Sequence, residues 1–317
     1  MPELTNKIKE VARDLLQQNK VDLVIGFEQG TLPLHSTPCF IRQEAEVDRL
    51  TWDSFCENNL AKYLPKRPGK IAIVAKGCDV RAVVELIKEN QLSREQVVII
   101  GVPCRGMIDR KQVEAELGEK EILEVEEKDN DLILKGAEYK ETLNRNDFLH
   151  PSCNICTHKN PVIYDILIGD MVTEQDNTSY LDIEQFETRP AEERWDYLSN
   201  EFSKCIRCYA CRNACPLCYC QECFVDSTCP QWIGKTTNTS DTTSFHIMRA
   251  FHLAGRCVEC GACERACPMG IDIRKLNTKL AKDVNDLFAY QAGINLEQAA
   301  PLATFKPDDP EGFIFNP

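Results

Sequence analysis

The chain has 317 residues and 18 cysteines, and its 37 basic and 50 acidic side chains give a formal net charge of −13. This length predicts two domains, and the acidic balance argues against a nucleic-acid or anionic-membrane partner, because both require a basic surface. We expect a cytoplasmic protein whose many thiols serve metal or redox chemistry, since we find no apolar signal-peptide core near the N-terminus and no aliphatic run long enough to span a membrane.

Residues 1–175 have the pattern of an α/β domain. Apolar spacing predicts helices at 4–16, 51–64 and 79–90, buried strands at 21–28, 70–77, 97–104 and 164–170, and a hairpin of 121–127 with 131–136. Strand, helix and strand follow one another with short connections, which is typical of a parallel βαβ unit. The fold class predicted for this half is therefore α/β with a partly parallel sheet.

The rest of the chain is predicted to hold a second domain and two flanking segments. Residues 176–204 read as a helical connector, with a helix at 191–202. Residues 205–290 contain most of the cysteines and enclose a Cys-rich insertion, 217–256, in which a Ser/Thr/Asn-rich loop at 236–243 leads into a helix at 244–255. The Pro-rich residues 291–317 are expected to form an extended tail.

One cysteine motif occurs twice in this second domain. The run Cys205, Cys208, Cys211, Cys215 and Pro216 has the same spacing as Cys257, Cys260, Cys263, Cys267 and Pro268. The doubled motif is that of bacterial two-cluster ferredoxins, in which the fourth cysteine of each run binds the other cluster. We therefore predict a bacterial 2[4Fe–4S] ferredoxin-like domain with crossed ligand sets, in which Cys205, Cys208, Cys211 and Cys267 hold the first cluster and Cys257, Cys260, Cys263 and Cys215 the second. Zinc also takes four thiolates, but it does not need crossed sets.

The insertion holds four further cysteines at a spacing that fits no standard signature. They are Cys218, Cys220, Cys223 and Cys229. Three interpretations stay open for them: a third [4Fe–4S] cluster, a zinc site, or unligated thiols.

Four cysteines of the first domain form another candidate ligand set. Cys78 and Cys104 each follow a predicted strand, and the ends of parallel strands meet at one edge of a sheet. Cys153 and Cys156 form a C-x2-C pair that supplies two more ligands for a fourth cluster. The alternative is that Cys78 and Cys104 are small buried apolar residues. Cys39 and Cys56 are then expected to be free.

Two segments of this domain resemble a known family. VVIIGVPCRGMI at 97–108 is similar to the Gly-Thr-Pro-Cys segment of the beta subunits of deazaflavin (coenzyme F420) hydrogenases and formate dehydrogenases. CNICTHKNPVIYDILIGD at 153–170 resembles their C-x2-C segment and the strand after it. The run that begins at Cys205 also resembles iron–sulfur stretches of proteins associated with heterodisulfide-reductase-like complexes. The resemblance implies that Cys104, Cys153 and Cys156 are cluster ligands, with Cys78 as the natural fourth.

Members of that family bind FAD, and this chain departs from them in having no G-x-G-x-x-G motif. Gly77, Asp79 and Arg81 lie at a strand-to-helix turn and are the candidate contacts to a flavin phosphate. The alternative for these residues is an ordinary turn, and we expect FAD to be absent.

These patterns predict an iron–sulfur subunit of a multi-subunit anaerobic oxidoreductase. It would relay single electrons between a flavin or catalytic subunit and a second redox subunit, and its partners would be flavoprotein, heterodisulfide-reductase-like, dehydrogenase or hydrogenase subunits. We find no nucleophile elbow or Ser/His/Asp pattern, so nothing in the sequence indicates a hydrolase. We expect an electron-transfer subunit of an oxidoreductase complex rather than a stand-alone enzyme. The alternatives are a flavin-containing beta subunit that itself oxidises or reduces a deazaflavin or nicotinamide coenzyme, and a zinc-binding scaffold without a redox role.

Overall fold

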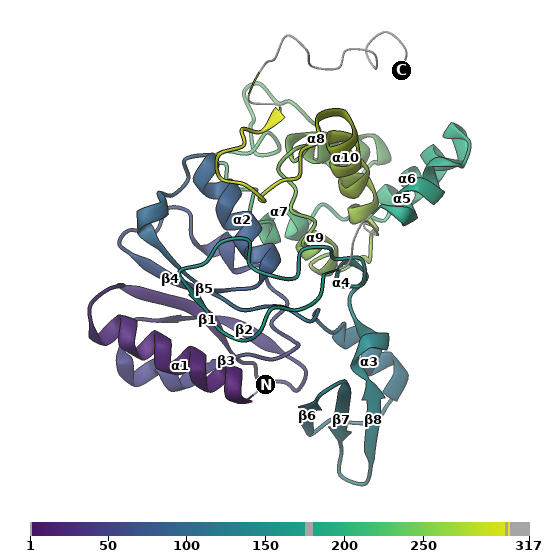
Figure 1. The fold of residues 1–317 in the computed structure, drawn as a ribbon. Helices are drawn as coiled ribbons and strands as arrows, with labels where there is room; N and C mark the ends of the chain where they lie inside the picture. Colours follow the sequence, from purple (N-terminus) through teal and green to yellow (C-terminus); the bar gives the residue numbers. More distant parts are fainter. Residues whose placement is uncertain (1, 175–179, 302–303, 305–317) are drawn as a thin grey trace. The chain divides into compact units, whose positions relative to one another are not determined.

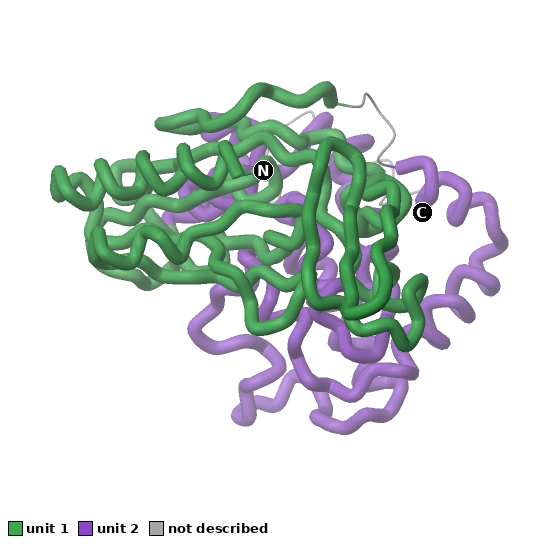
Figure 2. The backbone as a smooth tube through the Cα atoms, turned by 90° about the horizontal axis from the view of Figure 1, so that it is seen from below, with its two compact units in different colours: residues 1–80, 91–176 green, residues 81–90, 177–317 purple. Residues whose placement is uncertain are grey.

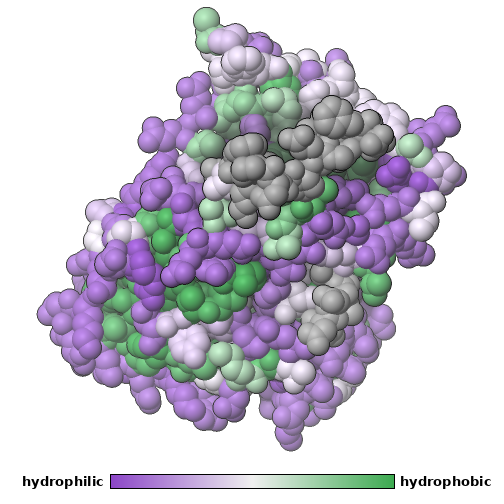
Figure 3. Space-filling model, turned by 45° about the horizontal axis from the view of Figure 1, so that its top comes forward, coloured by the Kyte–Doolittle hydropathy of each residue, from purple (hydrophilic) through white to green (hydrophobic). Residues whose placement is uncertain are grey.

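The computed structural model describes residues 2–174, 180–301 and 304. The chain divides into two compact units, which are coloured separately in Figure 2. Unit 1 comprises residues 1–80 and 91–176, and unit 2 comprises residues 81–90 and 177–317. No helix among the residues described is both long and apolar enough to cross a bilayer. On the face seen in Figure 3, hydrophilic side chains alternate with smaller apolar areas.

A partly parallel sheet forms the centre of unit 1 (Figure 1). Its strands are β1 (Leu23–Gln29), β2 (Ser36–Ile41), β3 (Leu50–Thr51), β4 (Ile71–Ala75), β5 (Val97–Gly101) and β9 (Ile166–Leu167). Their order is β2-β1-β4-β5-β9, and β3 pairs with β1. The steps from β1 to β4, β5 and β9 are parallel, whereas β2 and β3 run antiparallel to β1. The predicted α/β class with a partly parallel sheet is confirmed.

Helices cover this sheet because its strands are apolar on both faces. All five residues of β4 are buried, which is typical of a central parallel strand. α1 (Pro2–Gln17) buries Ile8, Ala12 and Leu15 against the sheet. α2 (Gly77–Lys88) begins directly after β4 and continues into the part of the chain assigned to unit 2.

A second, three-stranded sheet extends unit 1. It consists of β6 (Glu124–Lys128), β7 (Asp131–Lys135) and β8 (Lys140–Asn144), all antiparallel. Leu132 and Leu134 of β7 pack into an apolar cluster with Val113 and Leu117 of α3 (Arg110–Leu117). The predicted hairpin is present, and the sequence pattern missed β8 and also β2. The short elements of unit 1 are η1 (Glu44–Arg49), η2 (Leu60–Tyr63), η3 (Arg94–Gln96), η4 (Arg145–Phe148) and α4 (Pro151–Asn154).

The prediction of a helix at 51–64 is wrong. Residues 50–51 pair with β1 instead, and a 3-10 turn, η2, occupies 60–63. Polar side chains in this segment bind the backbone locally: Asp53 accepts from the amide of Phe55, and Asn59 accepts from that of Ala61. Such bonds compete with helical hydrogen bonding, and apolar spacing alone does not reveal them.

Unit 2 is helical. Besides the end of α2 it contains α5 (Leu181–Glu187), α6 (Ala191–Ser203), α7 (Ala210–Ala214), α8 (Thr239–His252), α9 (Ala262–Arg265) and α10 (Ile273–Phe288). α8 contacts α6 and α10, and α7 contacts α9. The helix predicted at 244–255 begins earlier, at Thr239, so part of the predicted loop 236–243 is helical. Of the predicted tail, residues 302–303 and 305–317 lie outside the described residues.

His246 lies buried in the core of unit 2. Its ring stacks on Phe202, with 4.7 Å between ring centroids, and meets Phe245 edge-on. Both ring nitrogens are buried without a hydrogen bond among the described residues. Burial, together with Arg249 and Arg207, lowers the pKa of His246 to about 4.

This core histidine predicts a loss of stability in mild acid. The unfolded chain binds a proton at His246 near pH 6.5 and the folded chain only near pH 4, so stability falls as the pH drops between these values. The group alone is expected to lower the free energy of unfolding by about 2 kcal/mol from pH 7 to pH 5. Anaerobic urea unfolding of His246→Phe at both pH values should show a smaller difference than the native chain.

His252→Phe, on the exposed end of the same helix, is the matched control and should keep the native pH dependence. An equal dependence in His246→Phe and the native chain would contradict the prediction.

Candidate metal centres

The edge of the unit 1 sheet brings the candidate N-terminal ligands together. Ala75 of β4 pairs with Gly101 of β5, so Cys78 and Cys104 follow two strands that end level. The segment after the C-x2-C pair lies over these ends, because the amide of Cys104 donates to the carbonyl of Lys159 at 2.9 Å. A Cβ on Gly77 would lie 2.3 Å from the carbonyl oxygen of His158, so only glycine permits this approach.

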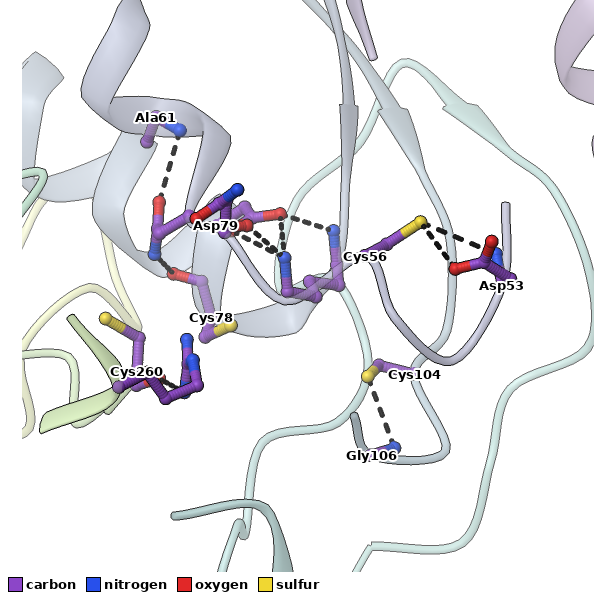
Figure 4. A network of polar contacts seen from close by, with 12 residues as sticks. Asp53, Cys56, Ala61, Cys78, Asp79, Cys104, Gly106 and Cys260 are labelled. Atoms are coloured by element: carbon purple, nitrogen blue, oxygen red, sulfur yellow. Dashed lines mark hydrogen bonds and ion pairs between the residues drawn. The ribbon is translucent and has the colours of Figure 1, made fainter. Parts of the chain in front are cut away.

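The thiols of this edge interact with one another. Cys104 interacts electrostatically with Cys153 and Cys156, and Lys76 interacts with both Cys78 and Cys104. In Figure 4 the sulfur atoms of Cys78 and Cys104 point toward each other, and that of Cys104 faces the amide of Gly106. This amide donates to Cys104 Sγ at 3.3 Å, and the Met107 amide donates to Cys153 Sγ at 3.4 Å.

Two buried cations stand beside these thiols, and the sequence analysis missed both. Lys76 donates to Asp79 at 2.9 Å, and although burial opposes its charge, Asp79, Cys78 and Cys104 together raise its pKa. Arg145 donates to the carbonyls of Arg105 and Gly106 at 3.1 and 2.8 Å, which fixes the turn after Cys104. The only signal for Lys76 in the sequence is a lysine that ends an apolar strand.

Cys104 of this edge has a thiol that is protonated at neutral pH when no metal is bound. Burial, followed by the neighbouring Cys153, raises the pKa of Cys104 to about 12. A cluster ligand must be a thiolate, so metal binding here displaces protons. The amide donors and cations described above stabilise that thiolate state.

The three candidate flavin contacts make close contacts within the protein. The α-carbon of Gly77 faces backbone carbonyls of 158–160. Asp79 is fully buried in its ion pair with Lys76. Arg81, also buried, donates from Nε to the carbonyl of Ala292 at 3.0 Å. These contacts favour the alternative interpretation of the motif, a turn that is fixed by packing.

Cys39 and Cys56 lie in the core of unit 1. Burial raises the pKa of Cys39, on β2, to about 12. The thiol of Cys56 donates to Asp53 Oδ1 and accepts from the Asp53 amide, both at 3.4 Å, as Figure 4 shows. These placements suit protonated thiols.

In unit 2 the two copies of the repeated motif adopt the same backbone conformation. Arg207 and Tyr209 have φ of 57° and 59°, and the equivalent Glu259 and Gly261 have φ of 55° and 69°. Each loop then enters a short helix, α7 or α9. Successive amides in mixed right- and left-handed conformations form a concave site for anions, as in many iron–sulfur proteins. The amide of Arg207 donates to Cys205 Sγ at 3.4 Å, and that of Glu259 bonds Cys257 in the same way.

The electrostatic neighbours of the cysteines lie both within and between the predicted sets. Cys205 interacts with Cys208 and Cys267. Cys211 interacts with Cys205 and Cys267 of its own set and also with Cys263 of the other set. In the other set, Cys263 interacts with Cys215 and Cys260, and Cys257 interacts with Cys263 and Cys260. Asn277 adds a side-chain amide 3.6 Å from Cys263 Sγ.

The two sets differ in their exposure to solvent. Cys208 is exposed, and Ile206 and Met269 beside the first set are 52% and 43% exposed. The equivalent residues of the second set, Val258 and Leu217, are 3% and 2% exposed. The apolar residues beside the first set are thus exposed, whereas those beside the second set are buried.

The insertion cysteines are dispersed. Cys218 hydrogen-bonds to Cys215, Cys223 interacts with Arg212, and Cys220 and Cys229 are exposed. Among the residues described, no three His, Cys, Asp or Glu side chains are close enough to hold a single metal ion. A four-iron cluster binds each thiolate at a different iron, so its ligands stand further apart than those of one zinc ion.

Arg249 of α8 is a further residue that the sequence analysis missed. It is 3% exposed, and its Nε is buried without a hydrogen bond among the described residues. A buried donor without an acceptor, beside cysteines, could donate a hydrogen bond to the sulfur atoms of a cluster when one is bound. The sequence signal is weak: one arginine within an otherwise half-apolar helix.

Comparison with known proteins identifies both parts of the chain. Residues 69–189 match the C-terminal family of the coenzyme F420 hydrogenase/dehydrogenase beta subunit, and residues 204–272 match the 4Fe-4S dicluster domain. The beta subunit of F420-dependent formate dehydrogenase from Methanocaldococcus jannaschii is 26% identical, over 89% of each chain. The beta subunit of F420-dependent formate dehydrogenase 1 from Methanococcus maripaludis is 24% identical, over 90% of each chain.

A solved structure of the F420-reducing [NiFe] hydrogenase complex from Methanosarcina barkeri contains a similar chain, with a TM-score of 0.40 and 12% identity. The match covers 50% of this chain and 63% of that one.

The fold and its cysteines thus define an iron–sulfur protein of the oxidoreductase class that takes part in electron transfer. The resemblance to the deazaflavin hydrogenase and dehydrogenase beta subunits is confirmed: one segment of the chain matches the model of that family, and the segment after it matches the 4Fe–4S dicluster domain. The prediction of several [4Fe–4S] clusters is also confirmed. The assignment of individual cysteines to clusters stays a prediction.

Cys267→Ser is expected to damage the cluster held by Cys205, Cys208 and Cys211, although Cys257, Cys260 and Cys263 lie nearer in the sequence. Serine is a poorer ligand than thiolate, so EPR spectra of the dithionite-reduced variant should lose or alter the signal of one cluster. Cys39→Ala, which removes a core thiol outside every ligand set, is the control and should keep all signals. A change confined to the cluster of Cys257, Cys260 and Cys263 would show that the ligands are not crossed.

Proposed function

We propose that this chain is the electron-relay subunit of a multi-subunit anaerobic oxidoreductase, with a ferredoxin-like arrangement of two [4Fe–4S] clusters in unit 2. The observation that carries the proposal is the pair of identical left-handed loops at the two cysteine repeats, with their amides directed at Cys205 and Cys257. When bound, the clusters supply one-electron chemistry; the chain supplies thiolates, amide donors and buried cations, which set the potentials.

The two ferredoxin-like sets have different roles in this proposal. The exposed Cys208, with the apolar Ile206 and Met269 beside it, suits electron exchange with a partner protein. The second set, flanked by buried Val258 and Leu217, suits transfer within the chain. The partners proposed are flavoprotein, heterodisulfide-reductase-like, dehydrogenase or hydrogenase subunits. The names of the relatives support a dehydrogenase complex, since two are beta subunits of F420-dependent formate dehydrogenases.

The relay is tested by composition and turnover of the anaerobically purified chain. Iron and sulfide should be present in four-atom multiples, with little zinc and no flavin, and the chain should exchange electrons with viologen dyes without turning over formate, coenzyme F420 or a nicotinamide. Turnover of one of these substrates by the isolated chain would overturn the relay. A chain that contains zinc and no iron would support the alternative of a zinc-binding scaffold without a redox role.

The second candidate is a flavin-containing beta subunit that itself reacts with a deazaflavin. It is favoured by the match of residues 69–189 to the hydrogenase and dehydrogenase beta-subunit family. Stoichiometric flavin after mild purification, together with reduction of the chain by reduced coenzyme F420, would decide for it.

We further propose a cluster at the strand-end edge of unit 1, held by Cys78, Cys104, Cys153 and Cys156. Its support is the set of electrostatic interactions that join Cys104 to Cys153 and Cys156, and Lys76 to Cys78 and Cys104. Its place suits the entry or exit of electrons, because the strand-end edge of an α/β domain is where ligands usually bind. The insertion cysteines are proposed as a third cluster or a zinc site with less support, since Cys220 and Cys229 are exposed.

The double variant Cys104→Ala/Cys153→Ala is expected to lose about four irons per chain, because it removes half of this ligand set. The matched control is Cys39→Ala/Cys56→Ala, which removes two core thiols of the same unit and should keep the native iron content. Iron and acid-labile sulfide are measured on the full chain. Equal iron content in the two double variants would show that these four cysteines do not hold a cluster.

A further inference from the structure

The insertion between the two cysteine repeats contributes one buried cation to the core of unit 2. Arg249 lies on α8, within residues 217–256, and its side chain is 3% exposed. Its Nη2 donates to the carbonyl of Cys211 at 3.2 Å, and its Nε has no acceptor among the described residues. The guanidinium is therefore fixed against one ligand loop and keeps an unused donor.

No carboxylate pairs with Arg249 in the described part of the chain. A buried charge without a partner is strongly unfavourable, so the compensating negative charge must come from other groups. Four cysteines interact electrostatically with Arg249, and they are Cys263, Cys215, Cys218 and Cys211. Burial opposes the charge of the guanidinium, and these thiols raise its pKa.

These four cysteines belong to different sets. Cys211 lies in the first predicted quartet, Cys263 and Cys215 in the second, and Cys218 in the insertion. Two runs of sequence separated by more than forty residues thus meet at one positive charge. Each [4Fe–4S] cube with four thiolates carries a formal charge of about 2− when oxidised, and it gains one more negative charge on reduction.

We propose that Arg249 is a positioning residue that raises the reduction potentials of both ferredoxin-like clusters, with the larger effect on the cluster of Cys257, Cys260, Cys263 and Cys215. A fixed positive charge favours the more negative, reduced state of each cluster. The effect is unequal because Arg249 interacts with two ligands of the second set and one of the first. This inference rests on the proposed relay and gives the insertion an electrostatic role.

The test is EPR-monitored redox titration of the full chain with Arg249→Gln and Arg249→Lys. The glutamine variant removes the charge and is expected to disfavour reduction of the second cluster at least tenfold, which is a fall in midpoint potential of about 59 mV or more. The first cluster should fall less. The lysine variant keeps the charge and should restore most of both potentials. Signals are assigned to clusters with Cys267→Ser, and iron content is measured for every variant.

Lys235→Gln is the matched control, because it removes one positive charge from the same unit at an exposed side chain whose ammonium donates to the Asp226 carbonyl. It should leave both potentials near their native values. Potentials of Arg249→Gln equal to those of this control would overturn the proposal, as would an equally large fall in Arg249→Lys.

Loss of iron also has a defined meaning. Loss of iron from Arg249→Gln with retention of iron in Arg249→Lys supports the proposal, since it shows that the positive charge at this position stabilises the negatively charged clusters. Iron lost from both variants overturns it and makes Arg249 a packing residue. If the proposed relay function is wrong, the native chain itself will lack clusters or will not exchange electrons with dyes. This result differs from a failure of the Arg249 proposal, which appears only in the variants.

Discussion

A thiolate can be buried in a protein only where a positive group or a hydrogen-bond donor stands beside it, and both units of this chain meet that requirement. In unit 1 the candidate ligands lie against Lys76 and the turn held by Arg145, and in unit 2 they lie against Arg249. Without a metal the same burial holds thiols such as Cys104, Cys211 and Cys263 in the protonated state, with pKa values of about 11 to 12.

The two units reach this arrangement by different routes. In unit 1, two parallel strands end level, so residues that follow them arrive at one edge, and a glycine lets the backbone of 158–160 approach it closely. In unit 2, a local backbone conformation is repeated: left-handed residues two and four positions after the first cysteine curl the amides around a concave site. The first route depends on tertiary pairing and the second is local, which is why only the second has a strong sequence signature.

The insertion of residues 217–256 shows how a long segment between the two cysteine repeats is accommodated in unit 2. Its helix α8 packs between α6 and α10, and its apolar side chains join those of the ligand loops in one core. The free-energy cost of closing a loop rises only slowly with the length of the loop. An insertion of about forty residues is therefore tolerated when part of it forms a buried helix. Both ring nitrogens of His246 and the Nε of Arg249, on this helix, are buried without a hydrogen bond among the described residues.

The sequence by itself determined the α/β class, the central strands and the two-cluster cysteine pattern, because apolar runs and cysteine spacing encode local geometry directly. It also indicated the convergence of Cys78 and Cys104, since parallel strands end at a common edge. Within residues 51–64, Asp53 and Asn59 oppose a helix through local hydrogen bonds to neighbouring amides. Tertiary structure alone decided that Thr51 pairs with β1. It alone also placed Lys76, Arg145 and Arg249 beside the thiols, since which buried cation meets which cysteine depends on contacts between segments far apart in the chain.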